Sequence, residues 1–429
     1  MKPNIIFYLS DGQRFDTLNP QVMPNLWELS KEGARFTNSF TCHPDSVAAS
    51  ACLQTGSYTT QLDRSKNGGV LSEGTKTIAD YFNDNGYDTA FIGEWRLADK
   101  GKNAVPKEQQ GGYKYWRAAN TLGITAQGEA VCVFDENGNK SELNGYRADA
   151  INALAIEYIN SREEDNSPFL MFVSQPELTL KKGNSHFEGF NETVESFRNY
   201  PIPEDLSFLK GNYKQEYPNY ISAINRIDHN FGELVKSLKE KGLYENTVVI
   251  YTSNYGCHFK TRNSKYQQSC HDSAIHTPLV IFGGAYKKGV VDNRLVSLID
   301  LPATMLDLAD IYVPSTFLGV SVFDGTEADE RRNSIFIQLC KSQTRAVRTD
   351  KYKYSVTAPR LGALSGKAKI YFEAYLYDLS HDSNEKMNLA NDKNFKGIRK
   401  NLSDVLLPEM EKAWEEKPKI KPILFKRKK

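Results

Sequence analysis

The sequence predicts an α/β fold with a large mixed, mostly parallel sheet between helices, followed by a small antiparallel sheet with a helix. Short apolar runs alternate with helical patterns along the chain, which is typical of parallel sheets covered by helices. Several of these runs end at a polar residue. Beyond residue 330, short strand-like segments lie close together between turns. We therefore predict an N-terminal α/β domain over residues 1–330 and a C-terminal α+β subdomain over residues 331–429.

The apolar runs are short and nearly free of polar residues, as in strands that are buried on both faces. They occupy residues 5–9, 89–92, 169–173, 247–251 and 278–282. Apolar residues recur at helical spacing over residues 23–33, 148–159 and 220–241. In the C-terminal subdomain we expect strands at 335–339, 344–348, 352–356 and 373–379, a helix over 402–414 and a frayed basic tail over 418–429.

The composition is that of an ordinary globular protein. Lys and Arg number 54 and Asp and Glu 53, so the net charge of +1 gives no overall field that favours nucleic acid. The six cysteines show neither a CxxC pair nor a zinc pattern, and we expect free thiols. No apolar run approaches the ~20 residues that cross a membrane. The N-terminus lacks a secretory pattern, which predicts a cytoplasmic protein, or a periplasmic or secreted one if a signal was removed.

Polar side chains follow directly after several predicted strands. Asp11 comes after the first strand, Glu94 after the second, Ser174 after the third and Asn254 after the fourth. In open α/β sheets, ligands bind at the carboxyl ends of the strands. We therefore expect these four residues to lie at one edge of the sheet, and this expectation rests on topology alone.

A series of motifs then points to a family. The motifs occupy residues 2–7, 23–26, 32–38, 51–56, 86–93, 252–256, 345–350 and 375–379. Together, in order and at plausible spacing, they resemble the sulfatases of the alkaline phosphatase superfamily over nearly the whole chain. The resemblance implies the fold of that family and the hydrolysis of sulfuric esters. A fold does not by itself establish a function, so the site must be read residue by residue.

Sulfate-ester cleavage needs a divalent cation, an activated nucleophile and an acid. Sulfatases make their nucleophile, a formylglycine, from Cys or Ser in a Cys-x-Pro/Ala-x-Arg motif. The resemblance places Ser46 at that position and Ser50 where the family has Arg. Ser46 could be oxidised to formylglycine, attack as a plain serine, or be an inert hydroxyl that caps a helix; we favour the inert hydroxyl.

The metal motif also departs from the family pattern. Asp11 matches the first metal ligand of sulfatases, but Gly12 follows it, and Asn254 and Tyr255 replace an Asp and the His or Asn after it. Calcium takes six to eight oxygen ligands, several of them carboxylates. One carboxylate and one amide hold a dication weakly. We therefore expect no cofactor, with calcium as the alternative if the site still functions.

Two further catalytic motifs are substituted. The family pattern Lys-Trp-His reads Glu94-Trp95-Arg96 here, which reverses the charge expected next to the sulfate. Arg96 either compensates for this reversal or pairs with Glu94. Thr179 stands where the family often has a His that acts as general acid, and a hydroxyl does not donate a proton to a leaving group at neutral pH.

A polar segment after the metal motif is retained. His258, Lys260, Arg262 and His271 could line a pocket for an anionic sugar, or could belong to a structural loop whose polar groups bond to the backbone. The sequence supports both interpretations equally.

These substitutions predict a pseudo-sulfatase, a protein that retains the sulfatase scaffold for binding. Its predicted partner is a sulfated or anionic glycan, a second copy of the chain or an active paralogue, with neither nucleic acid nor membrane involved. The alternative is an active divergent sulfatase, or a hydrolase of phosphate or phosphonate esters that uses Ser46 as formylglycine or as plain serine.

Overall fold

The structure is a computed structural model that describes residues 2–62, 70–99, 101, 103–122, 131–163, 167–178, 187–286, 288–323, 333–339, 343–359, 367–416 and 418–422. The predicted boundary near residue 330 and residues 423–429 of the basic tail lie outside this set. No helix in the described part of the chain is both long enough and apolar enough to span a bilayer. The thiols of Cys42, Cys52, Cys132, Cys257 and Cys270 are free, as predicted.

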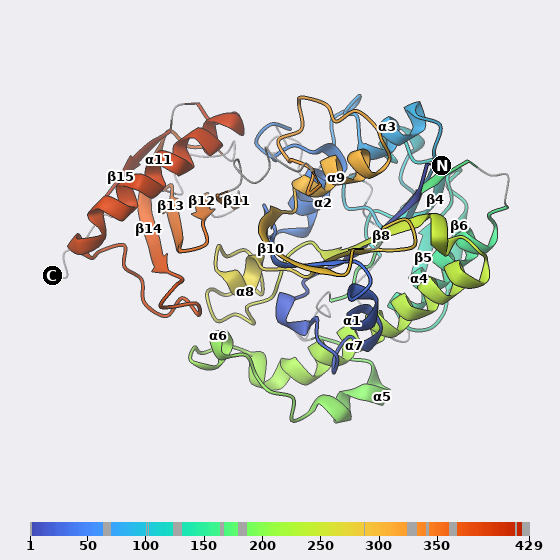
Figure 1. The fold of residues 1–429 in the computed structure, drawn as a ribbon, viewed down its shortest axis with the longest axis horizontal. Helices are drawn as coiled ribbons and strands as arrows, with labels where there is room; N and C mark the ends of the chain where they lie inside the picture. Colours follow the sequence, from blue (N-terminus) through green and yellow to red (C-terminus); the bar gives the residue numbers. More distant parts are fainter. Residues whose placement is uncertain are drawn as a thin grey trace.

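A ten-stranded mixed sheet forms the centre of the molecule (Figure 1). Its strands are β1 (Asn4–Ser10), β2 (Ala34–Phe40), β3 (Asp88–Glu94), β4 (Tyr115–Ala119), β5 (Val131–Phe134), β6 (Lys140–Leu143), β7 (Phe169–Ser174), β8 (Thr247–Ser253), β9 (Leu279–Phe282) and β10 (Val290–Ser297). They lie in the order β10-β2-β9-β8-β1-β7-β3-β4-β5-β6. Strands β8, β1, β7, β3 and β4 are mutually parallel, whereas β9 is antiparallel to both its neighbours. The predicted mixed, mostly parallel sheet is confirmed.

Helices cover both faces of this sheet. They are α1 (Pro24–Ser30), α2 (Ser46–Thr55), α3 (Ile78–Asp84), α4 (Arg147–Asn160), α5 (Asn191–Val194), α6 (Glu204–Ser207), α7 (Tyr213–Glu240), α8 (Asp272–Ile275) and α9 (Asp300–Leu308). Successive side chains of a strand point to opposite faces. Ile5, Phe7 and Leu9 of β1 therefore join the core under α2, α3 and α9. Ile6 and Tyr8 join the core under α1, α4 and α7.

The C-terminal sheet has the strand order β11-β12-β13-β14-β15. Its elements are β11 (Ile335–Leu339), β12 (Thr344–Arg348), β13 (Tyr352–Thr357), β14 (Ile370–Asp378), α11 (Lys396–Lys412) and β15 (Lys419–Lys421). The first four strands are antiparallel, as predicted, and β15 adds to β14 in parallel. Helix α11 packs against β12 and β13. In Figure 1 this sheet and its helix lie at one end of the molecule.

Two helices begin earlier than the sequence predicted. Helix α7 begins at Tyr213 rather than at residue 220, although Pro218 lies within it. The buried rings of Tyr213 and Tyr217 pack in the core, and this packing outweighs the local cost of the proline. Helix α11 begins at Lys396, whereas the sequence predicted a start at residue 402. The prediction missed the first turns because they are polar and carry no apolar periodicity.

A buried ion cluster connects the two sheets. The ammonium of Lys353 on β13 contacts the carboxylates of Asp272 on α8 and Glu385 after β14, the latter at 2.6 Å. The side chain of Lys353 is 0% exposed and that of Glu385 is 2% exposed. Arg348 of β12 also approaches Asp272, at 3.4 Å. The two cations and the two carboxylates of this cluster therefore neutralise each other within the protein.

We expect Lys353→Met to lower the free energy of unfolding by about 3–5 kcal/mol, because the two carboxylates would lose the cation that they share in a buried site. Urea denaturation would measure the change. The matched control is Lys31→Met, because Lys31 is 58% exposed and pairs with the exposed Glu28. Its effect should stay below about 1 kcal/mol. Equal effects of the two substitutions would contradict the prediction.

Candidate functional site

Two of the four residues predicted at the strand ends, Asp11 and Glu94, line one cavity of about 250 Å³. Ser174 and Asn254 are buried and are not among its lining residues. Asp11 follows β1, Glu94 ends β3, and Tyr255 lies just beyond β8. Ser46 is the first residue of α2 and reaches the same cavity from the next layer. The lining residues are Asp11, Gly12, Ser46, Glu94, Arg96, Leu178, Phe187, Tyr255, Gly256, Cys257, Tyr266 and Gln267.

Asp11 is the hub of the site, and both of its carboxylate oxygens are engaged. Oδ1 accepts a hydrogen bond from Nδ2 of Asn254 at 3.1 Å. Oδ2 accepts from the phenol of Tyr255 at 3.0 Å and from Nη2 of Arg96 at 3.2 Å. The Ser46 hydroxyl lies 3.3 Å from the same oxygen. The carboxylate is 4% exposed, so these contacts replace its hydration.

Arg96 forms an ion pair with both carboxylates of the site. Its Nη2 lies 2.5 Å from Glu94 and 3.2 Å from Asp11, and its side chain is 7% exposed. The other oxygen of Glu94 accepts from the backbone N–H of Leu122 at 3.1 Å. Of the two alternatives considered for Arg96, the pairing with Glu94 is confirmed, and compensation for the reversed charge stays a prediction.

The backbone after β3 determines where Arg96 lies. Arg96 has a φ of +66°, which is uncommon for a residue with a side chain. Its N–H donates to the carbonyl of Asn120 at 3.0 Å, and that of Trp95 donates to Ala119 at 2.9 Å, so the end of β4 fixes the turn. Gly93 allows the close approach of β7, because a Cβ there would lie 2.1 Å from the carbonyl oxygen of Ser174.

The charges of the site influence each other. Burial raises the pKa of Asp11 above its usual value, and Arg96 opposes part of this rise. Burial alone would lower the pKa of Arg96, but Asp11 and Glu94 raise it above its usual value. Burial, and then the charge of Asp11, raise the pKa of the Tyr255 phenol, which therefore stays protonated at neutral pH.

Ser46 contacts the phenol of Tyr255 more closely than it contacts Asp11. The two hydroxyl oxygens lie 2.8 Å apart. If Tyr255 donates its proton to Asp11, its oxygen accepts the proton of Ser46. Asp11 is then not a dedicated base for Ser46. The interpretation of Ser46 as a helix cap is wrong, because Asp45 is the N-cap of α2 and accepts from the N–H of Ala48.

A divalent cation does not fit this arrangement. Calcium needs six to eight oxygen ligands, whereas the guanidinium of Arg96 already lies against the carboxylates of Asp11 and Glu94. In the part of the chain that the structure describes, no group of three or more His, Cys, Asp or Glu side chains could hold a metal ion.

Ser50 is buried within α2 and is not among the lining residues of the cavity, and Thr179 falls outside the described residues. The sequence also gave no indication of the buried pair between Arg147 and Glu177, at 2.5 Å. The carbonyl of Glu177 accepts from the N–H of Asp11 at 2.8 Å, so this pair lies directly behind the hub. The one sequence signal for this pair was that Glu177 lies close to Thr179, a position that the family resemblance had marked as catalytic.

The four residues that were predicted around an anionic sugar are not among the lining residues of the cavity. His258 contacts the carbonyl of Gln267 at 2.9 Å, and His271 contacts the phenol of Tyr377 at 3.0 Å. Arg262 donates to the carbonyls of Asn384 and Glu385, and Lys260 lies over the ring of Tyr266. These contacts favour the structural-loop interpretation, and the sugar-binding role stays a prediction.

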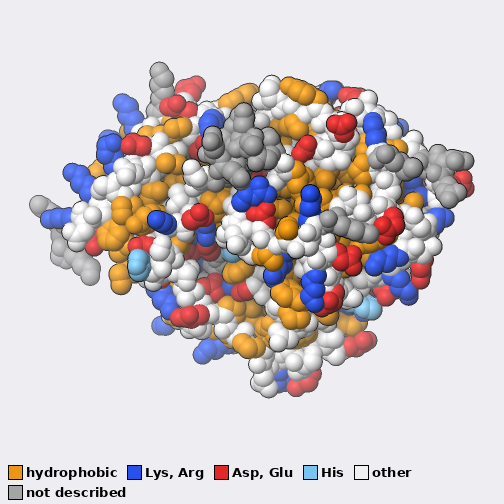
Figure 2. Space-filling view, in the orientation of Figure 1, with side chains coloured by type: hydrophobic (Ala, Val, Ile, Leu, Met, Phe, Trp, Pro, Cys, Tyr) orange, Lys and Arg blue, Asp and Glu red, His pale blue; other side chains and the backbone are white. Residues whose placement is uncertain are grey.

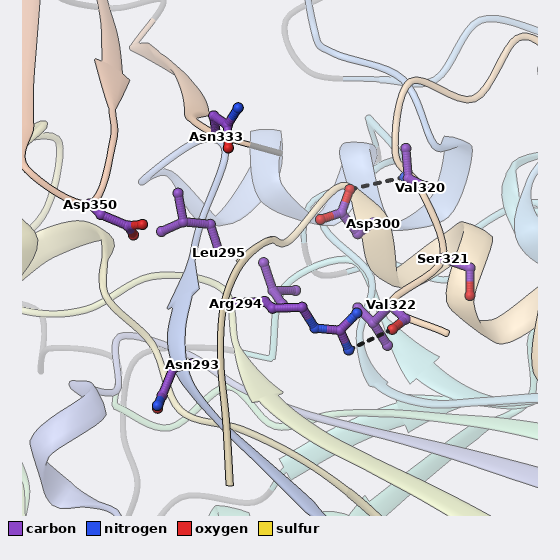
Figure 3. Close-up of a pocket in the computed structure, with 10 residues that line it drawn as sticks. Asn293, Arg294, Leu295, Asp300, Val320, Ser321, Val322, Asn333 and Asp350 are labelled. Atoms are coloured by element: carbon purple, nitrogen blue, oxygen red, sulfur yellow. Dashed lines mark hydrogen bonds between the residues drawn. The ribbon is translucent and has the colours of Figure 1, made fainter. Parts of the chain in front are cut away.

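A larger cavity of about 470 Å³ lies between β10, the loop after α9 and the C-terminal sheet (Figure 3). Two of its charged groups, Arg294 and Asp300, already bond to the protein. Arg294 donates to the carbonyl of Val322 at 3.0 Å, and Asp300 accepts from the N–H of Val320 at 3.1 Å (Figure 3). On the face shown in Figure 2, acidic and basic side chains of the described residues are interspersed, and this face shows no large patch of one charge sign.

Comparisons with known protein families agree with the motifs. A family model described as Sulfatase matches residues 3–311. A second model, described as N-sulphoglucosamine sulphohydrolase, C-terminal, matches residues 266–412. The chain is 26% identical over 455 residues to an uncharacterized sulfatase, YidJ, of Escherichia coli (strain K12), covering 96% of this chain and 88% of that protein. It is 25% identical over 475 residues to an arylsulfatase of Clostridium perfringens, covering 96% and 95%.

Solved structures show the same fold. A Bacteroides fragilis protein assigned as the sulfatase yidJ has a TM-score of 0.81 at 22% identity, with 96% of each chain covered. A protein solved in complex with its substrate D-glucosamine-2-N,6-O-disulfate has a TM-score of 0.79 at 18% identity, with 97% of this chain and 99% of that chain covered.

The buried imidazole of His258 predicts acid sensitivity. Burial lowers its pKa to about 4, whereas an exposed histidine titrates near 6.5. Between these values the unfolded chain binds more protons than the folded chain. The free energy of unfolding should therefore fall as the pH falls from about 6.5 to about 4, by up to about 1.4 kcal/mol per pH unit for this histidine.

Urea denaturation across this pH window would measure the slope, and His258→Gln should reduce it. His229 is exposed on α7, so His229→Gln is the matched control and should leave the slope unchanged. A slope that is the same in the wild type and in His258→Gln would contradict the assignment.

Proposed function

We propose that this chain, which belongs to the sulfatase family, is a pseudo-sulfatase: a sulfatase scaffold that binds a glycan without hydrolysing sulfate esters. One observation carries the proposal. The guanidinium of Arg96 lies between the carboxylates of Asp11 and Glu94, where it supplies the positive charge that a dication would otherwise bring.

A guanidinium cannot replace the chemistry of a metal. A divalent ion acts as a Lewis acid, and it keeps coordination positions open for substrate. Arg96 only donates hydrogen bonds, its pKa is too high for acid catalysis, and its charge is already shared by two carboxylates. The site can therefore orient a ligand, but its described residues supply no strong electrophile to a sulfate ester.

The nucleophile position supports the same proposal. A formylglycine hydrate releases sulfate by re-forming its aldehyde, whereas a serine sulfate has no such route. Ser50 stands where the maturation motif has Arg, and its side chain is buried in α2. Ser46 as a plain hydroxyl would therefore be trapped after a single transfer.

One contact favours the alternative of an ester hydrolase. The Ser46 hydroxyl lines the cavity, 2.8 Å from Tyr255 and 3.3 Å from Asp11, so it is placed where a nucleophile would act. Intact-mass measurement of the purified protein tests the oxidised form, because formylglycine lowers the mass by two hydrogen atoms. Release of phosphate from an aryl phosphate tests the plain serine.

The decisive assay is the turnover of aryl sulfates and of glucosamine 6-sulfate, with calcium and with chelator. We expect no release of sulfate above the level of a Ser46→Ala variant. Turnover that calcium supports and Ser46→Ala abolishes would overturn the proposal and establish an active sulfatase.

We further expect Arg96→Ala to gain weak calcium binding, because it leaves the carboxylates of Asp11 and Glu94 without a cation, and we expect none in the wild type. Without calcium, this variant should lose about 3–5 kcal/mol of unfolding free energy. Added calcium should raise its Tm, measured by calorimetry. The matched control is Arg117→Ala, which should gain no calcium binding. Arg117 lies on β4, pairs with Glu136 and is 25% exposed. Calcium binding by the wild type at one equivalent would contradict the prediction.

A further inference from the structure

We propose that the cavity at Asp11 binds the free hydroxyl groups of an unsulfated sugar, rather than a sulfate ester. This inference rests on the proposed function and specifies its ligand class. Three features of the described residues carry it: unpaired buried polar atoms, the charge of the cavity lining and its aromatic side chains.

The first feature is a donor and an acceptor without partners. Nη1 of Arg96 and Oδ1 of Asn254 are buried and have no hydrogen-bond partner among the described residues. Both side chains bond to Asp11 through their other polar group, so the two unpaired atoms flank the same carboxylate. Arg96 lines the cavity, whereas Asn254 is not among the lining residues. Buried polar groups are rarely left unpaired, so the unpaired Nη1 of Arg96 beside the cavity indicates a missing ligand or water.

The chemistry of these atoms selects the ligand. A hydroxyl group donates one hydrogen bond and accepts others, so a sugar hydroxyl can accept from Arg96 and donate to a carboxylate. The carboxylates of Asp11 and Glu94 line the cavity and offer acceptors to such donors. A sulfate group has only acceptor oxygens and cannot donate to either carboxylate.

The charge of the lining points in the same direction. Among the described lining residues, Asp11 and Glu94 carry negative charge and Arg96 alone carries positive charge. An anion that enters this cavity meets an excess of negative charge in a desolvated site, which raises the cost of binding it. A neutral or amine-bearing sugar meets no such repulsion.

The remaining lining residues suit one sugar ring. Phe187 and Tyr266 pack edge to face, with ring centroids 5.4 Å apart, and both line the cavity next to Leu178. Aromatic side chains present an apolar surface to the C–H face of a sugar while the hydroxyls bond elsewhere. The volume of about 250 Å³ is at the small end for ligand sites, which favours a monosaccharide unit over a longer chain within the cavity.

Calorimetric titration with matched pairs of saccharides tests the inference. The probes are D-glucosamine and N-acetyl-D-glucosamine with their 6-sulfates, and chondroitin and heparin disaccharides with and without sulfate. We expect at least one unsulfated probe to bind about tenfold or more tightly than its sulfated partner. Saturable binding of sulfated probes alone, equal affinity within every pair, or no binding of any probe would overturn the inference.

Two variants test the physical cause. Glu94→Gln removes one negative charge and leaves an oxygen that can accept from the N–H of Leu122. It should raise the affinity for the sulfated probe and so reduce the preference for the unsulfated probe. Phe187→Ala removes one aromatic side chain of the lining and should weaken the unsulfated probe about tenfold. Glu233→Gln, at an exposed position of α7, is the matched control and should change neither affinity. A preference that Glu94→Gln leaves unchanged would contradict the electrostatic cause.

The sulfate-release assay separates this inference from the proposed function. Release of sulfate would overturn the pseudo-sulfatase proposal, whichever saccharide binds more tightly. Absence of release together with a preference for sulfated saccharides would overturn only the inference made here.

Discussion

The ion pairs from Arg96 to Asp11 and Glu94 are the interaction on which the site depends. Two carboxylates buried at the ends of the parallel strands β1 and β3, on either side of β7, need a counter-charge, since a buried unpaired charge is strongly unfavourable. Arg96 supplies it from the turn that follows β3, in a backbone conformation held by the end of β4. The hydrogen bonds of Asn254 and Tyr255 to Asp11 then complete a network that is largely closed within the protein.

The sheet makes such a network possible. Alternate side chains of β1 fill two separate cores, so the strand cannot shift its register without exposing both sets. The positions at its end are therefore fixed with respect to α2 on one side and β8 on the other. The same rigidity explains why substitutions at the catalytic positions are compatible with an intact scaffold: folding depends on the apolar layers, whereas chemistry depends on a few polar residues at their edge.

The fold could be predicted from the sequence wherever burial leaves a periodic pattern, and β11 and β12 were predicted to the residue. The strands β2 and β10 were missed, because they mix polar and apolar residues and pair through long-range contacts. At the site, topology predicted that Asp11, Glu94 and Asn254 lie at one edge. It could not predict that Arg96 reaches both carboxylates, because this depends on the positive φ of that residue.

A covalently attached cation differs from a bound one in ways that matter for function. A metal site is filled only when the ion is available, whereas a guanidinium is present in every copy of the chain and keeps its charge at all physiological pH values. Its planar donors have fixed directions, so Arg96 can hold Asp11 and Glu94 in place and still offer Nη1 to a ligand. Under the proposal that Arg96 takes the place of a metal, this exchange gives up Lewis acidity and retains orientation. A site built in this way suits recognition of a sugar better than cleavage of its ester.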